Sequence, residues 1–115
     1  MQKISGHPVA IDGGEHVMFA DFKDDGPMWA GEGTREVREV VRFSEPFHRP
    51  PQVIVAVSML DVSNAANIRF DVLAENVTAE GFEIVFSTWS DTRLARARVT
   101  WQAVGAAPDD EAWEL

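Results

Sequence analysis

The chain of 115 residues contains no cysteine, and its 10 lysines and arginines are outnumbered by 19 aspartates and glutamates. Without thiols there are no disulfides, no thiolate metal sites and no cysteine nucleophile. The net charge of −9 argues against the concentrated cationic surface that phosphate binding requires. Nucleic acid and anionic membranes are therefore disfavoured as partners.

Long apolar runs are missing as well. The N-terminus lacks the hydrophobic stretch of a signal peptide, and no later segment is long enough to span a bilayer. We expect a soluble domain without membrane insertion. The sequence leaves open whether it works in the cytoplasm or, after export or assembly, at a cell or particle surface. With 45% hydrophobic residues, the chain has enough apolar side chains for one core.

From residue 37 onward, β-type segments alternate with turn-forming residues at the spacing of a sandwich or barrel. The expected strands are 37–43, 52–60, 67–75, 82–89 and 93–104. In the last segment, residues 95, 97, 99, 101 and 103 are small or apolar and alternate with polar ones. This period of two predicts that one face lies in the core. The third segment alternates in the same way and places Ile68 and Phe70 on its apolar face and Arg69 on its polar face.

The first 36 residues are less regular. Segments 3–11 and 17–22 predict two short strands, whereas 24–33 predicts a loop because it contains Gly26, Pro27, Gly31 and Gly33. No helix is strongly indicated, so the expected fold class is all-β.

We expect the chain to divide into three parts. Residues 1–34 supply an N-terminal strand and an acidic loop that complete the sandwich, and 35–105 form its core. Residues 106–115 form an acidic tail, either a frayed end or a segment whose Trp113 and Leu115 anchor in a neighbouring groove.

The sequence carries no recognisable enzyme or cofactor signature. It lacks a nucleophile elbow, a phosphate-binding loop and a dinucleotide fingerprint. His7, His16 and His48 have no metal-ligand spacing. Segment 21–32 matches part of a calcium loop, but Lys23 stands where an oxygen ligand is needed. We expect no catalytic activity, no metal and no cofactor.

Trp89 ends an apolar segment and is followed by Ser90-Asp91-Thr92, which places its ring at the rim of the sheet. An aromatic face beside hydrogen-bonding groups suits a sugar, and Arg69 could supply several donors. The alternative interpretation is structural: Trp89 closes the core edge, and Arg69 forms an ion pair with Asp71, Glu75 or Glu83.

Several short motifs, taken in order, resemble the H-type lectin domain, the family of snail agglutinins and of the C-terminal domains of the slime-mould discoidins. The motifs are Val41-x-Phe43-Ser44-x-Pro46-Phe47, Leu60-Asp61-Val62, Asn67-Ile68-Arg69, Thr88-Trp89-Ser90-Asp91-Thr92 and Val99-Thr100-Trp101-x-Ala103. The similarity covers residues 35–105, with Thr34 extending it upstream.

This resemblance implies a six-stranded antiparallel β-sandwich that forms a trimer or a dimer of trimers. It also implies binding of galactose-type sugars, notably N-acetylgalactosamine, near subunit boundaries. By resemblance, the arginine of the site is Arg69, the tryptophan is Trp89, the residue after it is Ser90, and the acid that receives sugar hydroxyls is Glu32.

Three positions depart from the family pattern. The acid is usually an aspartate, the histidine often found after the tryptophan is Ser90, and the aromatic that closes the site is Ala95. Two functions stay open on this basis. One is a multivalent lectin for galactose or N-acetylgalactosamine glycans in adhesion or attachment. The other is an oligomeric, spike-like attachment module with weak or altered sugar binding.

Overall fold

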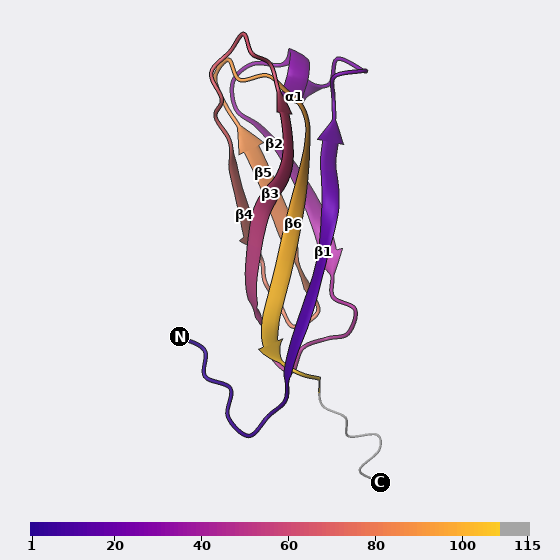
Figure 1. Ribbon diagram of the computed structural model, residues 1–115, viewed down its shortest axis with the longest axis vertical. Coiled ribbons are helices and arrows are strands. Elements are labelled where there is room, and N and C mark those ends of the chain that lie inside the picture. The colour runs from indigo at the N-terminus through magenta and orange to yellow at the C-terminus, as the bar shows by residue number, and fades with distance from the viewer. Residues whose placement is uncertain (109–115) are drawn as a thin grey trace.

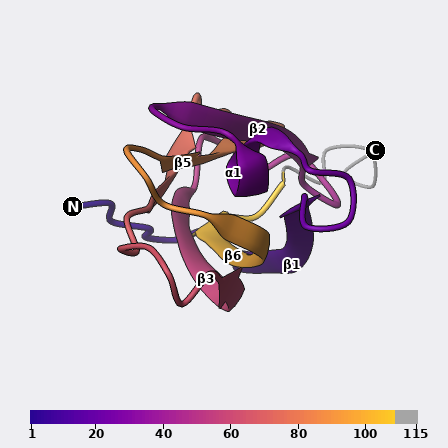
Figure 2. The same cartoon turned by 90° about the horizontal axis from the view of Figure 1, so that it is seen from above.

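Two antiparallel sheets of three strands each pack face to face in the computed structural model, which describes residues 1–108 (Figures 1 and 2). The strands are β1 Val9–Ala20, β2 Arg35–Arg42, β3 Gln52–Val62, β4 Asp71–Glu75, β5 Gly81–Thr88 and β6 Leu94–Ala106. One sheet has the order β1-β6-β3 and the other β2-β5-β4. The expected all-β, six-stranded antiparallel sandwich is confirmed.

The inner faces of the two central strands, β5 and β6, supply much of the core. Ala97, Val99 and Ala103 of β6 are fully buried, as the alternation predicts. Towards one end of the sandwich the ring of Trp101 packs edge-on against Phe82, with centroids 5.4 Å apart. Burying an aromatic side chain of this size stabilises the fold by roughly 1.5–3 kcal/mol.

The two short strands expected before residue 23 are wrong, because the structure has one continuous strand, β1. It pairs with β6 from Val9 to Ala20 with a single irregularity between Val17 and Phe19. A glycine is needed in its middle, since a Cβ on Gly14 would lie 2.9 Å from Nε1 of Trp101. The glycine lets the strand pass over the indole ring without a break.

The expected loop 24–33 contains a short helix, α1 (Pro27–Ala30). Proline at the first helical turn fits because its missing N–H would be unpaired there. The carboxylate of Asp21 accepts a 3.0 Å hydrogen bond from the Met28 N–H, and the Met28 side chain is fully buried. A buried side chain and an acceptor at the helix start therefore order this segment.

Strand β4 begins at Asp71, four residues later than expected. The backbone before it is bound by hydroxyls instead of by a neighbouring strand. Thr92 Oγ1 donates to the carbonyl of Asn67 (2.7 Å), and Thr88 Oγ1 donates to that of Arg69 (2.5 Å). Ile68, predicted to share the core face, is 56% exposed because this segment leaves the sheet.

Three connections gather at one end of the sandwich: residues 21–34 with α1, residues 63–70, and residues 89–93 (Figure 1, top). We call this the loop end. The N-terminus lies at the opposite end. Trp113 and Leu115, the candidate anchors of the tail, lie outside the described residues. Within residues 1–108, no helix has the length and apolar character needed to cross a membrane.

Candidate functional site

Trp89 stands at the loop end, directly after β5, and its side chain is 42% exposed. The preceding residue, Thr88, is fully buried, and its hydroxyl holds the carbonyl of Arg69. The chain thus anchors itself immediately before the tryptophan and then presents the indole to solvent. This agrees with the expected rim position.

Arg69 is held by hydrogen bonds at its backbone and at its side chain. Its carbonyl is bound by Thr88, and its Nη1 donates to Oδ1 of Asp91 at 2.5 Å. The alternative prediction, an ion pair of Arg69 with Asp71, Glu75 or Glu83, is wrong, because the carboxylate that Arg69 binds is that of Asp91.

Two of those carboxylates are engaged by another arginine. On the β2-β5-β4 sheet, Arg38 binds Glu36 (2.8 Å), Glu75 (2.9 Å) and Glu83 (3.1 Å). The hydrogen bonds that Arg38 donates, to Glu36 first and then to Glu75 and Glu83, raise the pKa of Arg38 above its ordinary value. Glu75 and Glu83 are register partners at the far end of β4, whereas Arg69 precedes the start of β4 and pairs with Asp91 of the Trp89 loop.

Ser90 links the tryptophan to the acidic loop. Its backbone is left-handed, with φ of 60°, so the chain turns directly after Trp89. Its carbonyl accepts hydrogen bonds from the Gly33 N–H (3.0 Å) and from Nη2 of Arg35 (3.1 Å). Glu32, exposed and next to Gly33 in the chain, is thereby held close to the Trp89 loop.

Arg35 is the organising residue that sequence reasoning missed. Its side chain is buried, and all four of its hydrogen bonds run to backbone carbonyls: those of Gly33, Pro27, Met28 and Ser90. One planar guanidinium thus joins α1, the Glu32 loop and the Trp89 loop. The sequence signal was its position at the start of a strand, two residues after Gly33, which does not reveal these acceptors.

Thr88, Thr92 and Asp91 were also missed as positioning residues, although all three belong to the motif around Trp89. Thr92 is fully buried and bonds the carbonyl of Asn67. Their hydroxyls and carboxylate determine where the segment 67–69 lies. A threonine on each side of Trp-Ser-Asp is the one pattern that could have indicated this role.

Glu32, Arg69, Trp89 and Ser90 therefore lie on connected loops at one end of the molecule; we call this set the Trp89 site. It combines an exposed aromatic face, a guanidinium and a carboxylate. These groups can pack against C–H bonds, donate to hydroxyls and accept from hydroxyls. In the described part of the chain, no three His, Asp or Glu side chains gather in a way that could hold a metal ion.

Comparison with known protein families matches residues 38–104 to the H-type lectin domain. The chain belongs to the H-type lectin domain family. Membership of this family makes it a carbohydrate-binding, non-enzymatic type of domain.

The relatives of this H-type lectin domain differ in how much of their own length aligns with this chain. "ATP synthase subunits region ORF 7" of Fuscovulum blasticum is 50% identical over 110 residues, which cover 96% of each chain. A discoidin-1 polypeptide of Dictyostelium discoideum is 32% identical over 81 residues, which cover 70% of this chain and 32% of the discoidin. The chain thus spans about a third of that discoidin.

Among solved structures, this lectin domain resembles discoidin II of Dictyostelium discoideum, with a TM-score of 0.76. The match covers 94% of this chain and 40% of the discoidin, at 21% sequence identity. At that identity the match shows a common sandwich fold. The family itself is shown by the sequence comparisons.

Proposed function

We propose that this domain is a multivalent lectin that binds galactose or N-acetylgalactosamine glycans through the Trp89 site. The observation that carries the proposal is the exposed indole of Trp89, flanked by residues whose hydrogen bonds fix Arg69 on one side and the Glu32 loop on the other. A preorganised aromatic face beside a donor and an acceptor limits the ordering cost of binding a small, polar ligand.

Each residue has a distinct role in this proposal. The C–H face of the pyranose packs on Trp89, and the hydroxyls receive hydrogen bonds from Arg69. Glu32 accepts hydrogen bonds from hydroxyls, and Ser90 contacts the sugar beside the ring. Charge-assisted hydrogen bonds of this kind are about twice as strong as neutral ones. Such a shallow site gives weak affinity for one sugar, so several copies are needed for tight attachment.

We propose a homotrimer, or a dimer of trimers, as the form that supplies those copies. Support comes from the outer face of the β1-β6-β3 sheet, where Ile11, Val17 and Ile54 are 67%, 58% and 66% exposed. Covering apolar side chains of this size is favourable at roughly 25 cal/mol per Å² of buried apolar area. Closed rotational symmetry would then carry several Trp89 sites on one particle, for adhesion or attachment.

The test is binding of the intact oligomer to a panel of galactose, N-acetylgalactosamine and glucose glycans. We expect retention of the galactose-type glycans and its loss in Trp89→Ala with unchanged mass by light scattering. Val40→Ala is the matched control, because Val40 is 66% exposed on a strand face away from the loops. Absence of any retained galactose-type glycan for a correctly oligomeric sample would refute the proposal.

A second function is favoured by the way the polar groups of the site are already engaged. The Arg69 guanidinium is bound by Asp91, and the Ser90 carbonyl accepts two hydrogen bonds from within the chain. An attachment module that keeps the sandwich but binds sugar weakly would have this arrangement. Saturable galactoside binding that disappears in Trp89→Ala argues against this second function. An intact oligomer that retains no glycan supports it.

A further inference from the structure

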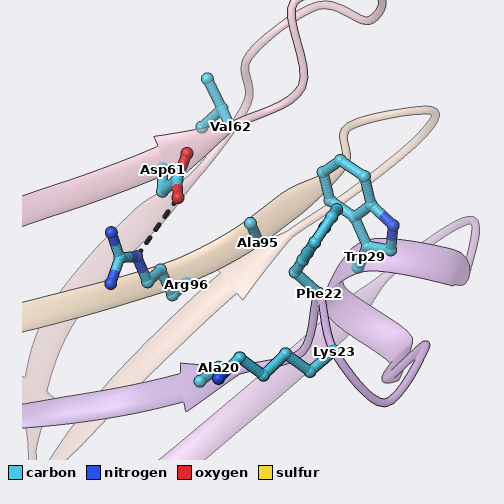
Figure 3. A pocket seen from close by; sticks show the side chains of 8 residues that line it. All are labelled: Ala20, Phe22, Lys23, Trp29, Asp61, Val62, Ala95 and Arg96. Carbon is cyan, nitrogen blue, oxygen red and sulfur yellow. Dashed lines mark hydrogen bonds and ion pairs between the residues drawn. The ribbon is translucent and has the colours of Figure 1, made fainter.

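A concave site also lies at the loop end. It is a cavity of about 450 Å³, within the roughly 300–1,000 Å³ typical of small-molecule sites. Its lining side chains come mainly from α1, the segment after β1, and the ends of β3 and β6 (Figure 3). They include those of Phe22, Lys23, Trp29, Asp61, Ala95 and Arg96. We call it the Phe22 cavity.

One side of the cavity is an aromatic wall. Phe22 and Trp29 meet edge to face, with centroids 5.0 Å apart, and Phe22 is 58% exposed. Arg93 fixes Trp29, since its Nε donates to the Trp29 carbonyl at 3.0 Å and its guanidinium carbon lies 4.6 Å from the indole centroid. The wall is therefore held in place without a ligand.

The opposite side of the cavity is charged. Figure 3 shows Asp61 and Arg96 on the other side of Ala95 from the aromatic pair, with the Arg96 guanidinium beside Asp61. Arg96 Nε donates to Asp61 Oδ2 at 3.2 Å, and its two terminal nitrogens remain to donate to a ligand. The side chain of Lys23 runs along the lower edge towards Ala20 (Figure 3).

The charge of this cavity opposes that of the whole protein. Two cations, Lys23 and Arg96, and one anion, Asp61, line it in a chain with a net charge of −9. An anion in the cavity can therefore accept hydrogen bonds from two positively charged side chains. The neighbouring carboxylate can accept hydrogen bonds from hydroxyls. Glu32, Arg69, Trp89 and Ser90 do not line it, whereas Ala95, which by resemblance stands where the family has the aromatic that closes the sugar site, does.

We propose that the Phe22 cavity is a second carbohydrate site, which takes a pyranose bearing a carboxylate, that is, an acidic sugar of the uronic class. The C–H face of the ring packs on Phe22 and Trp29, and the carboxylate meets Lys23 and the terminal nitrogens of Arg96. Asp61 accepts from the hydroxyls. Arg96 already has Asp61 as a charged partner, whereas a neutral sugar would leave Lys23 without one in the cavity, so the site prefers the acid.

Glucuronate and glucose form the matched pair of probes, because they differ at C6 in having a carboxylate or a hydroxymethyl group. Both have the gluco configuration, which keeps them apart from the galactose-type ligands proposed for the Trp89 site. Backbone amide shifts of the intact protein are followed during titration at low salt. We expect glucuronate to shift the amides of residues 22–23, 61–62 and 95–96, with at least about fivefold higher affinity than glucose.

Lys23→Glu should weaken glucuronate binding at least about fivefold and leave galactoside binding unchanged. The control is Lys3→Glu, which changes the net charge by the same amount at the chain's other lysine, outside the cavity lining. It should alter glucuronate affinity by less than about twofold. Trp89→Ala should retain glucuronate binding, so that failure at one site is distinguishable from failure at the other.

Four outcomes would overturn the second site. They are equal affinity for glucose and glucuronate, shifts confined to residues 88–91, equal losses in Lys23→Glu and Lys3→Glu, and no binding of either sugar by the intact protein. Because Lys23 is exposed, its substitution tests the charge of the cavity without disturbing the core.

Discussion

Arg35 and Thr88 are direct partners across the β2–β5 pair, and both bury their side chains to bind backbone carbonyls of the loop end. Arg35 holds Ser90 and Gly33, and Thr88 holds Arg69. One pair of opposed residues therefore sets the positions of the loops that carry Trp89, Arg69 and Glu32. The Trp89 site depends on these two side chains, although neither is proposed to touch the ligand.

Thr88→Val should lower both stability and galactoside affinity. Valine keeps the shape of threonine but leaves the Arg69 carbonyl without its donor, which costs about 1–3 kcal/mol when the group is buried. Chemical denaturation and titration calorimetry measure the two effects. Thr88→Ser retains the hydroxyl and should recover most of the affinity. The exposed Thr100→Val serves as a control, and an equal loss there would contradict the role of Thr88.

Arg35→Met should loosen the loop end more than the sandwich. All four carbonyls lose the guanidinium together, and within residues 1–108 only those of Pro27 and Ser90 keep a backbone donor, so unfolding free energy should fall by at least about 2 kcal/mol. Hydrogen exchange at the Gly33 and Gly31 amides should accelerate more than exchange at Val99. Arg42→Met, at an exposed position of the same strand, is the control. Uniform acceleration over all strands would argue against a local role.

Asp91→Asn separates binding from stability. The Arg69–Asp91 pair is partly exposed, at 32% and 59%, so its loss should change unfolding free energy by less than about 1 kcal/mol. We expect galactoside affinity to fall by about 3- to 10-fold, because the guanidinium is no longer oriented by a charged acceptor. Calorimetry on the folded variant tests this. Unchanged or increased affinity would mean that Asp91 competes with the ligand for Arg69.

Glu32→Gln should weaken galactoside binding at least about 10-fold, which corresponds to about 1.4 kcal/mol, while thermal stability stays the same. Glu32 is exposed, so only the proposed contact with sugar hydroxyls depends on its charge. Glu39→Gln, a carboxylate outside the loop end, provides the comparison. If Glu32→Gln binds as the parent does, Glu32 is not part of the site.

Gly14→Ala should destabilise the sandwich by about 1–3 kcal/mol, because the new methyl group would overlap the indole of Trp101. Trp101→Phe removes the indole nitrogen that the methyl group would meet. In a double-mutant cycle measured by denaturation, the cost of the alanine should be smaller in the Trp101→Phe background. Additive effects would show that the close approach does not limit this position.

Alternating apolar residues were enough to predict an all-β fold, because the period of two is local and identifies the buried face of each strand. The inward set on β6, including Ala97 and Val99, follows directly from it. The number of six strands came from the family resemblance. The pattern gave no information on tertiary contacts before residue 35, so it missed the continuity of β1 over Gly14 and the burial of Met28 in α1.

By itself, the sequence determined the fold class, the family resemblance and the rim position of Trp89. Tertiary structure decided what holds the residues of the site. Arg35, Thr88 and Thr92 bind backbone carbonyls, which every residue carries, so no sequence pattern marks the acceptor. The partner of Arg69 depends on where the segment before β4 meets the Trp89 loop, and the Phe22 cavity likewise depends on how separate segments meet. Such contacts exist only once the two sheets have packed.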